Sequence, residues 1–194
     1  MQFNIPNTLT LMRIAVIPLF VGVFYLPSHW LTDPQMNLIA TVLFVLAAIT
    51  DWLDGYLART LGQTSAFGAF LDPVADKLMV AAALILLVQL GRADAIVAVI
   101  IIGREITISA LREWMARIGQ SASVAVATVG KFKTAAQMTA IPLLLYHESL
   151  FGLPVALIGE LLVYVAAALT LWSMAYYLHR ALPLLARHDR GGRD

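Results

Sequence analysis

The 194-residue sequence contains no cysteine and has few charged residues. The missing thiols exclude disulfide bonds and thiolate metal ligands, so any bound metal must be held by oxygen or imidazole. Charged residues make up 13% of the chain, whereas soluble domains have about 25%. Hydrophobic residues make up 60% of the chain. The net charge of +1 gives no indication of nucleic-acid binding. This composition predicts a membrane protein.

The hydrophobic residues gather into six stretches, and a helix of about 20 residues is enough to cross a bilayer. The predicted spans are about 9–27, 36–57, 70–90, 94–115, 133–147 and 154–178. Helices satisfy their own backbone hydrogen bonds in lipid, so we predict an all-α polytopic membrane protein, a six-helix bundle forming one domain over residues 1–194. A short interfacial segment, Gln2–Asn7, should precede the first span, with Asn7, Thr8 or Thr10 as helix cap. A flexible tail is expected from about residue 184.

Lysine and arginine are distributed unevenly between the predicted connections. The 58–69 and 116–132 connections and the chain end hold most of them: Arg59, Arg117, Lys131, Lys133, Arg180, Arg187, Arg190 and Arg193. The other connections contain only Arg92. Because positive charge marks the cytoplasmic side, both termini and these two connections should be cytoplasmic.

Four aspartates lie close together in the sequence, at the end of the second span and the start of the third. Asp51 and Asp54 are three residues apart, so they share one face of a helix. Asp72 and Asp76 are four apart and share a face of the next helix, although Asp72-Pro73 also reads as a helix N-cap. The short connection should make the two helices antiparallel neighbours, with the carboxylate pairs facing each other.

Clustered carboxylates near a membrane repel one another unless cations compensate their charge. With oxygen ligands alone, Mg²⁺ or Mn²⁺ is the expected ion. Mg²⁺ usually leaves coordination positions for water and substrate phosphate, so the site predicts a phosphate-bearing substrate. Arg59 could neutralise phosphate oxygens, and Gly55 and Gly68 would allow a ligand or a helix to approach the backbone, although helix packing would explain Gly68 equally well.

The aspartates belong to a longer pattern, D-x₂-D-G-x₂-A-R-x₈-G-x₃-D-x₃-D, from Asp51 to Asp76. On this pattern the chain resembles the CDP-alcohol phosphotransferase family, whose motif it matches at all eight fixed positions. The resemblance implies six transmembrane helices, commonly a homodimer, and an enzyme that cleaves a CDP-linked substrate with release of CMP.

The resemblance also implies roles for single residues. Asp51, Asp54 and Asp72 would hold the metal, expected as two ions, and Asp76 would be the catalytic base or a further metal ligand. The expected binding residues for CDP-diacylglycerol are Asn7, Thr10, Asp54, Gly55, Arg59 and Gly68.

Three further stretches resemble bacterial members of that family that use glycerol 3-phosphate as acceptor: NIPNTLTLMRI, IIGREITISALREWM and SVAVATVGKFKTAAQM. The resemblance therefore implies transfer of a phosphatidyl group from CDP-diacylglycerol to glycerol 3-phosphate. The protein would lie in the bacterial inner membrane with its active site on the cytoplasmic side.

A dianionic acceptor requires cationic side chains. The candidates for binding its phosphate are Arg104, Arg112, Lys131 and Lys133. Ion pairs with Glu105, Glu113 or the aspartates would explain the arginines equally well, and ordinary loop charge or lipid contact would explain the lysines.

Two other charged residues stand out within predicted spans. Arg13 in the first span either contacts a substrate phosphate or extends its side chain to the interface. Glu160 in the sixth span is interpreted as a packing or dimer contact without a catalytic role.

Two other functions remain open from the sequence. The acceptor could be serine, inositol phosphate or another alcohol, with the same catalytic residues. The aspartates could instead form the ion path of a cation-coupled transporter, although their clustering near one membrane face argues against a path through the bilayer.

Overall fold

A computed structural model describes residues 5–60, 66–117 and 128–191. These residues form six long helices and one 3₁₀ turn, which confirms the predicted all-α fold. The helices are α1 (Ile5–Gly22), α2 (Asp33–Thr60), α3 (Ala66–Gln89), α4 (Ala95–Arg117), α5 (Thr128–Tyr146) and α6 (Val155–Gly191), and η1 (Val23–Tyr25) follows α1. Each of the six predicted spans overlaps one of these helices, although the predicted and observed ends differ by one to several residues.

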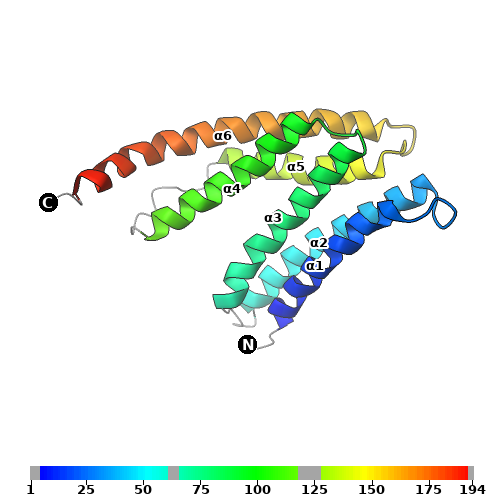
Figure 1. Ribbon diagram of the computed structural model, residues 1–194, viewed down its shortest axis with the longest axis horizontal. Coiled ribbons are helices and arrows are strands. Elements are labelled where there is room, and N and C mark those ends of the chain that lie inside the picture. The colour runs from blue at the N-terminus through cyan, green and yellow to red at the C-terminus, as the bar shows by residue number, and fades with distance from the viewer. Residues whose placement is uncertain (1–4, 61–65, 118–127, 192–194) are drawn as a thin grey trace.

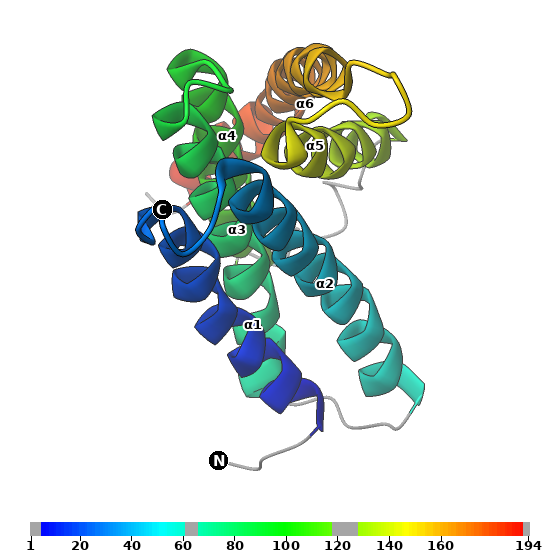
Figure 2. The same ribbon diagram turned by 90° about the vertical axis from the view of Figure 1, so that its right-hand side faces the viewer.

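The helices are arranged as two groups of three (Figure 1). The first arm is α1–α3, residues 5–89, in which α1 packs against both α2 and α3. The second arm is α4–α6, residues 95–191, in which α5 packs along α6 and α4 also contacts α6. The arms join at the turn between α3 and α4 and diverge from there toward the chain termini (Figures 1 and 2).

The apolar core lies where the two arms meet. Phe44 of α2 and Leu84 of α3 are buried together with Ile101 of α4 and Leu144 of α5. The buried apolar residues of this core recur at helical spacing, as Ala40, Phe44 and Ala47 do on α2. This is the pattern expected when apolar side chains pack between helices. The core fixes the arms to each other and extends along α2 and α3 to Ala47 and Met79, close to the motif aspartates.

Arg92, in the turn between the arms, reinforces this junction. Its guanidinium donates hydrogen bonds to the carbonyls of Leu144 (3.4 Å) and Leu145 (2.9 Å), and to Asn37 Oδ1 (2.8 Å). The two carbonyls belong to the last turn of α5, where helical carbonyls lack partners within the helix. One side chain therefore ties α2, α5 and the α3–α4 turn together.

Three helical segments are long and apolar enough to cross a membrane, among the residues that the structure describes: Asn7–Tyr25, Asp33–Leu57 and Val155–His179. Several apolar helices therefore mark the chain as a membrane protein. Six membrane spans stay a prediction.

Two expectations about helix caps are corrected. Asn7 and Thr10 lie inside α1 rather than capping it, and Asp72 and Pro73 lie inside α3, so Asp72 is no N-cap. α6 is helical to Gly191, and the expected flexibility from about residue 184 stays a prediction.

Candidate active site

The four motif aspartates are all carried by the first arm. Asp51 and Asp54 lie near the end of α2, and Asp72 and Asp76 lie in the first half of α3. Asp54 is close enough to Asp51 and Asp72 to interact with them electrostatically, and Asp76 interacts with Asp51 in the same way. The four aspartates therefore lie within electrostatic range of one another on the first arm.

α1 lies between the two carboxylate-bearing helices, which the sequence did not predict. α1 packs more extensively against α2 and against α3 than those helices pack against each other. Asn7, Thr10 and Arg13 recur every three residues on α1, so they share one helical face, and all three are buried. The polar residues at helical spacing within this apolar segment were the sequence feature that could have predicted a buried polar face on α1.

Arg13 extends from α1 to the carboxylates of α2. Its Nη1 donates to Asp51 Oδ1 at 2.5 Å, and its Nη2 donates to Asp54 Oδ2. The Arg13 and Asp54 side chains are almost completely buried, so the alternative in which Arg13 extends its charge to the interface is wrong. The other alternative, contact with the nucleotide or a substrate phosphate, stays a prediction. A planar guanidinium can bind two acceptors at once, and here it neutralises charge on both carboxylates.

Thr10 makes the corresponding contact with α3. Its hydroxyl donates to Asp72 Oδ1 at 2.5 Å and is completely shielded from solvent. α1 therefore fixes one carboxylate of α3 and two of α2. The assignment of Asn7 and Thr10 to nucleotide binding is not tested by these contacts.

The residues of this group fit a divalent cation by their chemistry. Every donor is a carboxylate oxygen, which suits Mg²⁺ or Mn²⁺. Within the described ranges, no three carboxylate or imidazole groups come together closely enough to ligate one ion. The positive charge beside Asp51 and Asp54 comes from Arg13, which forms ion pairs with both carboxylates.

The cations proposed for acceptor binding lie on the second arm. Lys133 of α5 donates to Glu105 Oε1 of α4, and Arg104 contacts the same oxygen at 3.1 Å. Arg104 also donates to Ser173 Oγ of α6 at 3.2 Å. Arg104 and Lys133 are both buried, so Glu105 holds two buried cations beside each other.

Tyr177 of α6 holds Arg104 and Arg112 on one face of α4. The Cζ atoms of Arg104 and Arg112 lie 5.7 Å and 5.5 Å from the centre of its buried ring. The Arg112 guanidinium also donates to the Tyr177 hydroxyl at 3.4 Å. The spacing of eight residues correctly predicted a shared face for the two arginines.

A small cavity connects the two arms at this level. It has a volume of about 60 Å³, and its lining includes Asp76 and Lys77 of α3, Glu105 of α4, and Lys133 and Gln137 of α5. The proposed base and one proposed acceptor cation therefore face the same space. An apolar groove of about 290 Å³ lies nearby between α2 and α5, lined by Phe44, Val45, Ala48, Ile49, Trp52 and Met138.

Four of the predicted site residues remain without a described role. Gly55 and Gly68 are placed next to the aspartates on α2 and α3. The side chains of Arg59 and Lys131 lie outside the part of the chain whose side chains are described.

In this apolar helical bundle, Arg13 pairs with Asp51 and Asp54, and Thr10 bonds to Asp72. Asp76 lines one cavity together with the buried Lys133. Residues 3–172 match the CDP-alcohol phosphatidyltransferase family, and the chain belongs to this family of transferases. Family members are generally metal-dependent.

The similarity to individual relatives extends over nearly the whole chain. Proteins from Pectobacterium atrosepticum and Sodalis glossinidius are each 52% identical over 191 residues, which cover 97% of this chain and 98% of the relative. A protein from Salmonella typhimurium is 50% identical over 183 residues, or 93% of this chain and 96% of the relative. All three relatives are named CDP-diacylglycerol–glycerol-3-phosphate 3-phosphatidyltransferase.

Proposed function

We propose that this protein transfers the phosphatidyl group of CDP-diacylglycerol to glycerol 3-phosphate, giving phosphatidylglycerophosphate and CMP. The observation that carries the proposal is the cavity between the arms, because Asp76 and Lys133 line it together. A carboxylate able to accept a proton thus lies beside a cation able to bind a phosphate. The names of relatives at about half identity over nearly the full chain agree with this reaction.

The first arm provides the donor half of the site. Asp51, Asp54 and Asp72 would hold divalent ions, with Asp76 as a further ligand or base. Mg²⁺ or Mn²⁺ in this position would neutralise charge on the diphosphate and on the leaving CMP. The apolar groove between α2 and α5 supports a donor with acyl chains, since it is lined by hydrophobic side chains.

The second arm provides the acceptor half. Arg104, Arg112 and Lys133 offer the charge that a phosphate monoester requires. The acceptor hydroxyl attacks the phosphorus that carries the diacylglycerol, the bond to the CMP oxygen breaks, and the hydroxyl proton passes to Asp76. Glu105 keeps Arg104 and Lys133 together before the acceptor arrives.

An acceptor without a phosphate is a poorer match to these residues. Serine carries no phosphate, whereas Arg104 and Lys133 are two buried cations that share one carboxylate. Inositol phosphate carries the required dianion, so it is the competing acceptor that must be tested directly.

The test is CMP release by the purified protein in detergent with CDP-diacylglycerol and Mg²⁺. Glycerol 3-phosphate, serine, inositol and inositol phosphate are compared as acceptors, and EDTA replaces Mg²⁺ in a parallel reaction. We expect turnover with glycerol 3-phosphate alone, lost with EDTA and reduced about 100- to 1000-fold in Asp51→Ala, since removing one group that stabilises transition-state charge has an effect of this size. Asp33→Ala, at the opposite end of α2, is the control and should keep full activity. Equal turnover with inositol phosphate would overturn the acceptor assignment, and absence of CMP with every acceptor would overturn the reaction.

The membrane arrangement is part of the same proposal. Six spans with both termini and the aspartates on the cytoplasmic side follow from the distribution of lysine and arginine. Glycerol 3-phosphate is charged, so a site on that side gives it access from the aqueous phase. A homodimer is expected from the family resemblance.

A further inference from the structure

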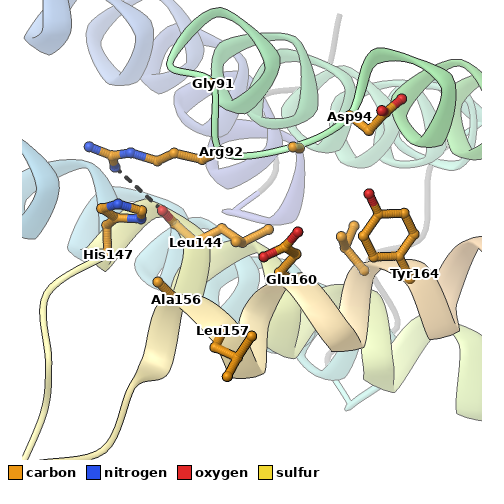
Figure 3. A pocket seen from close by; sticks show the side chains of 11 residues that line it. Gly91, Arg92, Asp94, Leu144, His147, Ala156, Leu157, Glu160 and Tyr164 are labelled. Carbon is orange, nitrogen blue, oxygen red and sulfur yellow. Dashed lines mark hydrogen bonds between the residues drawn. The ribbon is translucent and has the colours of Figure 1, made fainter.

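A second cavity lies at the junction of the arms, at the opposite end of the bundle from the aspartates. Its volume is about 460 Å³, and the α3–α4 turn, the end of α5 and the first turns of α6 form its walls (Figure 3). The reaction proposed above uses none of its residues. Its polar lining consists of Arg92, Asp94, His147, Glu160 and Tyr164.

Glu160 is the residue in this cavity that most requires a partner. It lies about one and a half turns into α6, within the apolar segment Val155–His179 that is suited to cross a membrane. Among the residues that the structure describes, none donates a hydrogen bond to Glu160 or forms an ion pair with it. An acidic side chain at the edge of the bilayer is costly without a cation, so the position favours a positively charged ligand.

The cavity has an acidic end and a basic end (Figure 3). Glu160 and Tyr164 extend from α6 toward the turn that holds Asp94. Arg92 and His147 lie on the other side of the cavity. Arg92 has acceptors for three of its five N–H donors in the described part of the chain, so donors remain for a ligand.

Two further polar residues of the lining, Asp94 and His147, are compatible with a ligand that carries both a positive and a negative charge. Asp94 accepts a hydrogen bond from the backbone N–H of Ile96 at 2.6 Å, which fixes its position at the start of α4. Partial burial and the nearby Arg92 guanidinium lower the pKa of His147, so this imidazole is neutral at pH 7 and does not repel an ammonium group. The geometry thus offers a carboxylate for an ammonium and a guanidinium for a phosphate.

The apolar surroundings indicate where such a ligand comes from. Leu144, Ala156, Leu157 and Val163 complete the lining, and the adjacent surface of α6 exposes Leu157, Ile158 and Leu161. An exposed apolar helix face in a membrane protein is covered by acyl chains. We propose that this cavity binds the headgroup of an ethanolamine phospholipid, with its primary ammonium at Glu160 and its phosphate at Arg92.

The test measures lipid binding to the purified protein in detergent by native mass spectrometry. Phosphatidylethanolamine, phosphatidylcholine and phosphatidylglycerol with identical acyl chains are compared. We expect phosphatidylethanolamine to bind at least about tenfold more tightly than phosphatidylcholine, which has no N–H donor for Glu160; tenfold is the lower range for one charge-assisted hydrogen bond. Glu160→Gln should lose about tenfold in affinity for phosphatidylethanolamine, and Tyr164→Phe should lose less.

Glu113→Gln is the control, because Glu113 is an exposed glutamate on α4 that lies outside the cavity lining. It should bind phosphatidylethanolamine as the unmodified protein does. CMP release by Glu160→Gln should be unchanged in detergent with CDP-diacylglycerol as the only lipid, which separates this proposal from the reaction itself. Equal binding of the ethanolamine and choline lipids, or full binding by Glu160→Gln, would overturn the proposal. Binding of free phosphoethanolamine as tight as that of the lipid would overturn the bilayer as its source.

Discussion

Arg13 is the residue on which the carboxylate group depends most directly. It is buried and contacts Asp51 and Asp54 together, so its removal leaves two neighbouring carboxylates without their cation. Breaking a buried ion pair in this way costs about 3 kcal/mol. Arg13→Gln should therefore lower the thermal unfolding midpoint of the detergent-purified protein in EDTA.

The same variant should respond more strongly to metal. With the guanidinium gone, added Mg²⁺ meets no competing charge at these oxygens, so Mg²⁺ should raise the unfolding midpoint of Arg13→Gln by more than it raises that of the unmodified protein. Arg112→Gln, which removes an arginine outside the aspartate group, should show the unmodified response to Mg²⁺. An Arg13→Gln midpoint that is insensitive to Mg²⁺ would show that Arg13 does not act as the counter-charge.

At the residue scale, the sequence predicted which residues form the carboxylate group better than it predicted which residues contact each other. The spacing from Asp51 to Asp76 predicted which carboxylates gather, because helical periodicity determines which side chains share a face. It did not predict that Arg13 pairs with Asp51, 38 residues away, or that Lys133 pairs with Glu105, 28 residues away. Such contacts depend on which helices become neighbours. The sequence of one chain contains little information about which helices pack against each other.

At the scale of elements, Tyr177 connects α6 to two of the arginines that we propose to bind the acceptor phosphate. Its ring lies against both Arg104 and Arg112, and cation–π contacts of this kind contribute about 1 to 2 kcal/mol when desolvated. Tyr177→Leu should raise the KM for glycerol 3-phosphate about tenfold, while the KM for CDP-diacylglycerol stays unchanged. Tyr177→Phe keeps the ring and should change either constant by less than about twofold. An equal rise in both constants would indicate a general packing defect instead of a positioning role.

The contact between α5 and α6 gives a second prediction at this scale. A Cβ added at Gly159 of α6 would lie 3.0 Å from Leu144 Cγ and 3.1 Å from the Leu144 backbone nitrogen. Gly159→Ala should therefore separate the helices and cost about 1 to 3 kcal/mol, seen as a lower unfolding midpoint. Gly103→Ala is the control, since nothing lies within 4 Å of a Cβ at that position and alanine favours helices. A Gly159→Ala midpoint equal to that of Gly103→Ala would contradict close packing at this point.

The sequence predicted the existence of each helix but not its ends. Apolar runs predicted six helices because their length matches a bilayer. The polar residues Asn7, Thr10 and Asp72 suggested caps, since such side chains often begin helices, yet all three lie inside helices in the structure. Thr10 and Asp72 bond to each other across α1 and α3, so the tertiary contact uses the polar atoms that local reasoning assigned to helix ends.

At the scale of the whole molecule, the absence of cysteine makes the predicted membrane arrangement simple to test. Single cysteines introduced as Ser28→Cys, Ser149→Cys and Thr60→Cys each provide one reactive thiol. Positions 28 and 149 should react with a membrane-impermeant maleimide in intact spheroplasts, and position 60 should react only after the membrane is permeabilised. Labelling of position 60 in intact spheroplasts would reverse the proposed orientation.

The division of the bundle into two arms has a consequence for how members of such a family diverge. The carboxylates that would activate the nucleotide-linked lipid lie between residues 51 and 76, whereas the cations that would select the incoming alcohol lie between 104 and 133 and depend on Tyr177. Substitutions in the second arm can therefore alter which lipid is made while leaving the bond-breaking chemistry of the first arm intact. Selection can act on product identity and on reaction chemistry through separate stretches of one gene.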